Sequence, residues 1–146
     1  MRLDRTLLAL FVVLAFGCAT GPEYKEIQSD IAAIEAGKGR VYLYRPQMSF
    51  LYVGSVTLNG EEVRVPSAGG FVYVDKEPGE YEVVIDAATN ESATFEFEAG
   101  EEVFIRITVD AGGLFLYTIS PQFTDRETAI REMQELNYPG PYVDER

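Results

Sequence analysis

The segments 80–86 (EYEVVID), 93–98 (ATFEFE) and 102–109 (EVFIRITV) alternate apolar and polar residues. Successive side chains of a β-strand point to opposite faces, so this period of two predicts strands with one buried and one solvent-exposed face. In the first segment, Val83 and Ile85 share a face that lies opposite the acidic residues. The pattern predicts a β-sheet protein.

Eight segments of this kind recur about every ten positions between residues 39 and 120, the spacing typical of a sandwich or barrel. They cover residues 40–45, 51–58, 62–65, 71–75, 80–86, 93–98, 102–109 and 114–120. We therefore expect an all-β domain over residues 39–120, built as an antiparallel β-sandwich of about eight strands. The last segment is apolar on both faces, so we expect the chain that follows to cover it.

Turn residues separate the expected strands. Asn59-Gly60 supplies the two positive-φ positions of a type I′ turn and predicts a hairpin between the segments on either side. Pro78-Gly79 predicts a second hairpin, between residues 71–75 and 80–86. Pro121 lacks an N–H group and is expected to end the last strand.

Two helices are expected outside this region. Ile27, Ile31 and Ile34 have helical spacing and predict a short N-terminal helix, which serves either as a spacer or as a helix docked on the sheet. In residues 121–146, Thr124 and Glu127 have the spacing of a capping box, with Thr124 as N-cap. An amphipathic helix should follow, before a charged tail, with its apolar face formed by Ala129, Ile130, Met133 and Leu136.

Composition excludes several classes of function. The 146 residues hold 12 Lys and Arg against 24 Asp and Glu, a formal net charge of -12, which repels the phosphates of nucleic acids. The chain has no His and one Cys, which excludes imidazole catalysis, a structural zinc site and an internal disulfide. We expect one folded domain without a cofactor or metal.

The first residues have the pattern of a secretory signal. Arg2 and Arg5 precede an almost unbroken apolar run over residues 6–16. At a rise of about 1.5 Å per residue, this run spans roughly half of a hydrocarbon core of about 30 Å, so it is too short for a transmembrane helix. Residues 1–17 are therefore predicted to be a cleaved signal peptide.

The end of this run, Leu14-Ala15-Phe16-Gly17-Cys18, resembles the lipobox of bacterial lipoproteins. The resemblance implies cleavage before Cys18, lipidation of its sulfur and acylation of the new amino terminus. Residues 18–38 would then be a lipidated tether with the short helix, and Ala19 implies sorting to the outer membrane, facing the periplasm. The alternative is an ordinary secretory signal in which Cys18 is an unmodified thiol.

A second resemblance covers the strand region. Its motifs are an aromatic-Arg-Pro opening in residues 37–46, the Asn-Gly turn in residues 56–60, an aromatic strand in residues 70–75 and Pro-Gly-x-Tyr in residues 78–81. They resemble an uncharacterised family of small bacterial lipoproteins grouped as a domain of unknown function, and more remotely PEGA-type modules and the prealbumin-like sandwich. The resemblance implies a β-sandwich without catalytic residues.

Candidate binding residues lie near the first strand. Tyr42, Tyr44 and Arg45 offer flat rings and a planar donor group for an anion or a glycan; the alternative is that they pack inside the protein. Met48 and Phe50 lie in the following loop, where exposed apolar atoms would favour contact with another protein.

The sequence favours binding over catalysis. We expect a lipid-anchored, non-enzymatic interaction or scaffolding module of the cell envelope, in contact with the membrane through Cys18 and with another envelope protein; the oligomeric state is not predicted. One alternative is a binding module for a cationic peptide or glycan. The other is a carboxylate-pair hydrolase, although the glutamates are expected on exposed faces or turns. These are Glu80, Glu82, Glu96, Glu98, Glu101 and Glu102.

Overall fold

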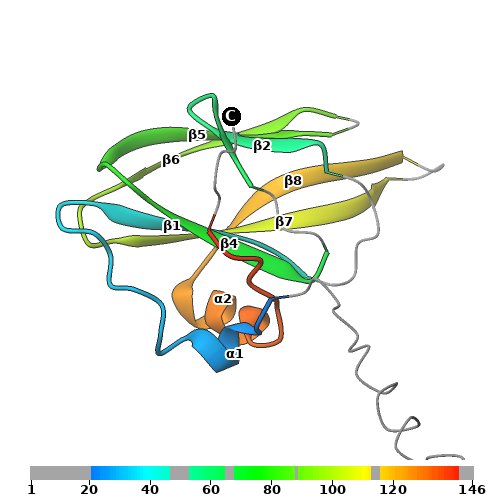
Figure 1. Ribbon diagram of the computed structural model, residues 1–146. Helices are drawn as coiled ribbons and strands as arrows, with labels where there is room; N and C mark the ends of the chain where they lie inside the picture. The colour runs from blue at the N-terminus through cyan, green and yellow to red at the C-terminus, as the bar shows by residue number, and fades with distance from the viewer. Residues whose placement is uncertain (1–20, 47–52, 65–67, 88, 113–115, 142–146) are drawn as a thin grey trace, which may run out of the picture.

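Two four-stranded β-sheets pack face to face to form the body of the protein (Figure 1). The computed structural model describes residues 21–46, 53–64, 68–87, 89–112 and 116–141. One sheet has the strand order β4-β1-β7-β8 and the other β3-β2-β5-β6, which confirms the expected two-sheet fold. The strands are β1 (Gly39–Arg45), β2 (Ser55–Leu58), β3 (Glu61–Val63), β4 (Gly70–Lys76), β5 (Gly79–Asp86), β6 (Glu91–Phe97), β7 (Glu102–Gly112) and β8 (Leu116–Thr124).

The core between the sheets is mostly aliphatic, with Phe97 as its buried aromatic residue. Alternating residues of each strand point inward, as the period of two predicted: Val83 and Ile85 of β5 are fully buried, and so are Val41 and Leu43 of β1. The removal of this apolar surface from water is the main force that holds the two sheets together.

Aromatic residues form a second core, on the outer face of sheet β4-β1-β7-β8. Helices α1 (Tyr24–Ile27) and α2 (Arg126–Met133) both lie against this face (Figure 1). All seven residues of β1 are therefore buried. The second core consists of Tyr24, Tyr42, Tyr44, Phe71, Phe104, Ala129, Met133 and Leu136.

One predicted turn is confirmed and another is wrong. Asn59 and Gly60 have φ values of 50° and 80°, and they join β2 to β3 as the expected type I′ hairpin. Pro78-Gly79, by contrast, leads from one sheet to the other, because β4 pairs with β1 while β5 pairs with β2 and β6. In addition, β1 and β7 are parallel, so the sandwich is not wholly antiparallel.

Strand β8 also differs from expectation. It continues through Pro121, which lies opposite Ile107, and ends at Thr124. The missing N–H group is tolerated because β8 is an edge strand. This strand was expected to be buried on both faces, but β1 is the strand that is buried in this way. Tyr117 of β8 remains 43% exposed.

Both expected helices are present, but the N-terminal one ends at Ile27, so Ile31 and Ile34 lie beyond it. Helix α1 has four residues, and Ile27 and Ile31 pack partly buried against the aromatic core, so this segment is docked on the sheet. The N-cap of α2 is Asp125 rather than Thr124: its Oδ1 accepts a hydrogen bond from the Thr128 N–H at 2.9 Å. Within the described part of the chain, no helix has the length and apolar character needed to cross a bilayer.

Candidate functional site

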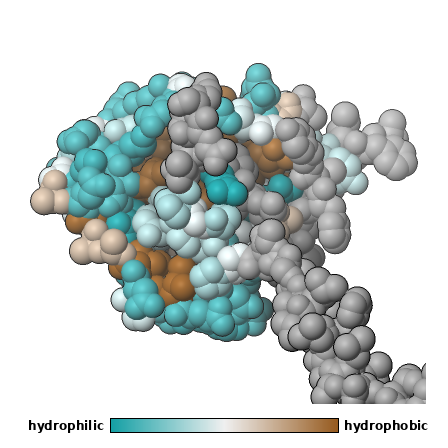
Figure 2. All heavy atoms as spheres, viewed as in Figure 1, coloured by the Kyte–Doolittle hydropathy of each residue, from teal (hydrophilic) through white to brown (hydrophobic). Residues whose placement is uncertain are grey.

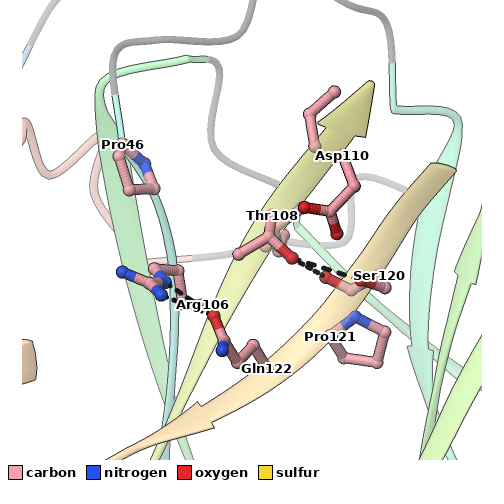
Figure 3. A pocket seen from close by; sticks show the side chains of 9 residues that line it. Pro46, Arg106, Thr108, Asp110, Ser120, Pro121 and Gln122 are labelled. Carbon is pink, nitrogen blue, oxygen red and sulfur yellow. Dashed lines mark hydrogen bonds between the residues drawn. The ribbon is translucent and has the colours of Figure 1, made fainter. Parts of the chain in front are cut away.

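A polar groove lies on the outer face of β7 and β8 (Figure 3). Its volume is about 540 Å³. It is lined by Pro46, Arg106, Ile107, Thr108, Val109, Asp110, Ser120, Pro121 and Gln122.

The pairing of the two strands places the polar side chains of the groove side by side. Arg106 lies opposite Gln122 and Thr108 lies opposite Ser120, on positions that alternate with the inward-facing residues of β7. The Thr108 hydroxyl donates to the Ser120 carbonyl oxygen at 3.1 Å and lies 3.2 Å from the Ser120 hydroxyl. The Asp110 carboxylate extends the same row and is exposed.

Glu132 of helix α2 forms an ion pair with Arg106, the residue at one end of this row. The Arg106 guanidinium donates through Nη1 to Glu132 Oε1 at 2.7 Å and through Nε to Gln122 Oε1 at 3.2 Å. The Tyr44 hydroxyl donates to the other oxygen of Glu132, also at 2.7 Å. The Glu132 carboxylate thus links the buried aromatic core to the cation of the groove, and it fixes the direction of the guanidinium.

Burial keeps the Tyr44 phenol protonated. Loss of solvation raises the pKa of Tyr44 to about 12; the hydrogen bond from Thr124 lowers it, and the neighbouring Glu132 carboxylate raises it further. At neutral pH the phenol is therefore a donor, as the Glu132 carboxylate requires.

The structure places Tyr42, Tyr44 and Arg45 in the interior, with exposures of 3%, 0% and 5%. The Tyr42 ring stacks on Phe104 at 4.8 Å between centroids, under the helices. None of the three presents an exposed face to a ligand, and Tyr44 reaches the groove only through Glu132. Cys18, Met48 and Phe50 lie outside the described residues.

Sequence reasoning missed the residues of the groove. The alternation of Arg106, Thr108 and Asp110 with apolar residues did signal a polar face on β7. The position of Gln122 was not predictable, because it depends on a strand that continues past Pro121 and on its register with β7.

The exposed face of the other sheet is acidic. Glu80 of β5 lies directly opposite Glu96 of β6, and both are exposed, as is the neighbouring Glu82. The upper part of the molecule in Figure 2, where β5 and β6 lie in Figure 1, is mostly hydrophilic. Of the six glutamates expected on exposed faces or turns, Glu102 alone is half-buried, and it accepts a hydrogen bond from Arg126 Nε at 2.7 Å.

The groove is chemically suited to hydrogen-bonded recognition. It combines a guanidinium, two hydroxyls, an amide and a carboxylate on adjacent strands, so it offers both donors and acceptors to a ligand. Among the described residues, no three His, Cys, Asp or Glu side chains gather closely enough to hold a metal ion.

One known protein family matches the strand region of the chain. The model of a family described as Protein of unknown function (DUF2846) matches residues 35–117, more than half of the chain. The chain belongs to the DUF2846 family. No curated protein matches it.

The DUF2846 match covers seven strands and the beginning of β8. Helices α1 and α2 lie outside it, and so do the groove residues Ser120, Pro121 and Gln122. In this DUF2846 protein, one wall of the groove and the residue that fixes its guanidinium, Glu132, therefore come from the chain beyond the matched region.

Proposed function

We propose that this protein is a lipid-anchored lipoprotein of the bacterial envelope, whose folded domain is a non-enzymatic interaction module that binds a partner in the polar groove of β7 and β8. One observation carries the proposal: Glu132 and Gln122 hold Arg106 in a fixed direction at the end of a row of hydrogen-bonding groups. Groups held in place before binding lose little conformational entropy when a partner arrives.

The sequence before the folded domain supports the anchor. Cys18 follows an apolar run of signal-peptide length and small residues, as in bacterial lipoproteins. One acyl chain binds a membrane only marginally, whereas three chains on one residue hold a protein almost permanently. Ala19 favours the outer membrane, with the domain facing the periplasm.

The partner that fits the groove best is an extended polar segment of another envelope protein. Such a segment carries amide donors and acceptors at regular spacing, and these complement the hydroxyls of Thr108 and Ser120 and the amide of Gln122. The exposed Asp110 favours an amine or amide near the outer end of the groove.

A second candidate is binding of a cationic peptide or glycan to the acidic face of β5 and β6. Directly opposed like charges destabilise a sheet, and Glu80 faces Glu96 in this way. A cationic ligand would relieve this repulsion. The hydrolase alternative gains less support, because Asp110 is the one carboxylate among the described residues that line the groove.

Membrane fractionation and fatty-acid labelling test the anchor. The Cys18→Ser protein should leave the membrane fraction and lose incorporated fatty acid, whereas the Ser29→Ala control should behave like the natural protein. Unchanged fractionation of Cys18→Ser would reject the lipid anchor.

Site-directed photo-cross-linking tests the groove. A photoreactive residue at the exposed groove position Asp110, which does not hold Arg106, should give a discrete cross-linked product in intact cells, and one at the exposed position Thr94 of β6 should not. A product from Thr94 alone, lost at high salt, would favour the acidic face instead, since salt screens exposed charges. Products from neither position would reject both binding proposals.

A further inference from the structure

The first described residues of the chain are docked on its C-terminal segment. The Tyr138 N–H donates to the Pro22 carbonyl oxygen at 2.9 Å, and the Tyr24 N–H donates to the Leu136 carbonyl oxygen at 2.9 Å. At Gly21 the fit is so close that an added Cβ atom would lie 1.7 Å from the Tyr138 carbonyl oxygen. Among the described residues, Gly21 and Pro22 are therefore fixed to the folded body.

The C-terminal segment is in turn fixed to the start of β4. The Asn137 N–H donates to the Gly69 carbonyl oxygen at 2.9 Å, and the Phe71 N–H donates to the Asn137 carbonyl oxygen at 3.0 Å. The Tyr138 ring stacks on Phe71 and Tyr73, at 5.4 and 5.3 Å between centroids. In Figure 1 the first described residues (blue) lie beside this segment (red).

The chain between the proposed anchor and the body is short. Cys18 and Gly21 are three residues apart, and consecutive Cα atoms are about 3.8 Å apart, so their separation is at most about 11 Å. A lipid on Cys18 thus holds Gly21, and the end of the sheet beside it, close to the bilayer.

The two ends of this sheet differ in charge. At the end of the sheet near Gly21, Arg45 pairs with Gly70. At the far end, about 20 Å away along the strand, Gly39 pairs with Lys76. Exposed residues beside the near end include the uncharged Pro22 and Ala68, together with Lys25, Glu26 and Glu135, whose charges partly offset one another. Exposed residues at the far end include the acidic Glu77, Glu98 and Glu101. Anionic headgroups repel acidic side chains and therefore favour the near end.

We propose that the end of the sheet formed by Gly21, the Gly69-Gly70 turn and Asn137 is a membrane-facing surface, and that the acidic end at Glu77 and Gly100 points away from the bilayer. This inference rests on the proposed lipid anchor at Cys18. Pro46 of the polar groove directly follows Arg45, so the groove opens beside the same end and meets its partner close to the membrane surface.

Fluorescence quenching by labelled lipids tests this orientation. Ala68 and Ala99 are exposed alanines in turns at opposite ends of the sheet, so Ala68→Cys and Ala99→Cys form a matched pair. In the lipidated protein the sulfur of Cys18 is occupied, so each variant has one free thiol for a fluorophore. In vesicles of phosphatidylethanolamine and phosphatidylglycerol with a nitroxide-labelled headgroup, we expect several-fold stronger quenching at position 68. Equal quenching, or stronger quenching at position 99, would overturn the orientation.

Two further variants test the cause of the orientation. A flexible insertion of ten Gly and Ser residues between Thr20 and Gly21 should retain the lipid and abolish most of the difference between the two labels. Gly21→Ala should weaken the difference, because its Cβ atom collides with the Tyr138 carbonyl. A full difference in the insertion variant would show that the tether does not set the orientation. Fatty-acid labelling separates the two proposals: its absence rejects the anchor, whereas labelled protein with equal quenching rejects the orientation alone.

Discussion

Arg40 and Asp75 lie opposite each other on β1 and β4 and form a buried two-point ion pair. Arg40 Nε and Nη2 donate to the two Asp75 oxygens at 2.6 and 2.9 Å. The remaining donors of the guanidinium reach the N-terminal segment, with the Ala32 carbonyl oxygen at 2.8 Å, and the group lies 4.4 Å from the centroid of the Tyr73 ring. The pair therefore joins the sheet to the segment that precedes it.

Removal of the Asp75 carboxylate should destabilise the protein strongly. Asp75→Ala leaves the Arg40 cation buried without its anion, and loss of one partner of such a pair costs about 3–5 kcal/mol. Urea denaturation of the two proteins measures the loss. The double variant Arg40→Met, Asp75→Leu should recover a large part of it, because no charge remains buried. A loss below about 1 kcal/mol in the single variant would contradict a buried pair.

The same pair predicts a loss of stability in acid. Burial raises the pKa of Asp75, but the hydrogen bonds from Arg40 and from the Glu35 N–H outweigh it, so the pKa of the folded state lies below the usual value of 3.8. The stabilisation is therefore complete above pH of about 4 and is lost as the pH falls through the folded value. Denaturation midpoints measured from pH 6 to pH 3 should fall more steeply for the natural protein than for Asp75→Asn. Parallel curves would refute this assignment.

The buried tyrosines predict that the protein also loses stability at alkaline pH. Burial raises the pKa of Tyr42 and of Tyr44 to about 12, from an ordinary value of 10, although the positive charge of the nearby Arg40 opposes the shift of Tyr42. Because the folded pKa values are raised, the stabilisation is complete below pH 10 and is lost as the pH rises toward 12. Ultraviolet titration should show Tyr42 and Tyr44 ionising together with unfolding. Ionisation of all tyrosines near pH 10 in the folded protein would contradict their burial.

The hydroxyl of Tyr44 should contribute measurably to stability. Tyr44→Phe removes the donor to Glu132 and the contact with the Thr124 hydroxyl at 3.0 Å, and a hydrogen bond to a charged group contributes about 1.5–3 kcal/mol. Chemical denaturation measures the change. Tyr117→Phe is the matched control at an exposed site, where about 0.5 kcal/mol or less is expected. Equal effects of the two variants would exclude a special role for the Tyr44 hydroxyl.

Close packing at the start of β1 should make Gly39 sensitive to substitution. A Cβ atom there would lie 2.4 Å from Phe97 Cδ2 and 2.9 Å from the Glu98 carbonyl oxygen, and overpacking of this kind costs about 1–3 kcal/mol. Thermal unfolding of Gly39→Ala should show the loss. Gly37→Ala is the neighbouring control: its Cβ atom meets nothing within 4 Å, although its φ of +81° adds backbone strain. A larger loss at Gly37 than at Gly39 would contradict the packing argument.

The sequence predicted individual strands better than their partners. Alternation of apolar and polar residues is a local property, so β5 was predicted nearly in full, and most of β6 and β7 was predicted without the first two residues of β6 and the last three of β7. The Asn59-Gly60 turn was predictable because its positive φ values depend on two adjacent residues. Pro78-Gly79 also predicted a chain reversal, but whether a turn joins two strands of one sheet or of two sheets depends on contacts made elsewhere.

The candidate site was less predictable than the fold. Tyr42 and Tyr44 were candidate binding residues because the sequence of their strand does not indicate that its outer face is buried. Helices α1 and α2, which precede and follow the sheets in the chain, bury that face. Arg40 and Arg45 both flank the same aromatic run, and only the register of β1 with β4 places Asp75 opposite Arg40.

The order of residues along the chain thus determines the period of each strand, the hairpin at Asn59-Gly60 and the acidic character of the protein. Tertiary structure alone decides which strands share a sheet, that Glu132 lies between Tyr44 and Arg106, and that Gly21 rests on Tyr138. The physical reason is range: backbone preference and alternation act between neighbouring residues, whereas register, cover and ion pairing join residues that are tens of positions apart.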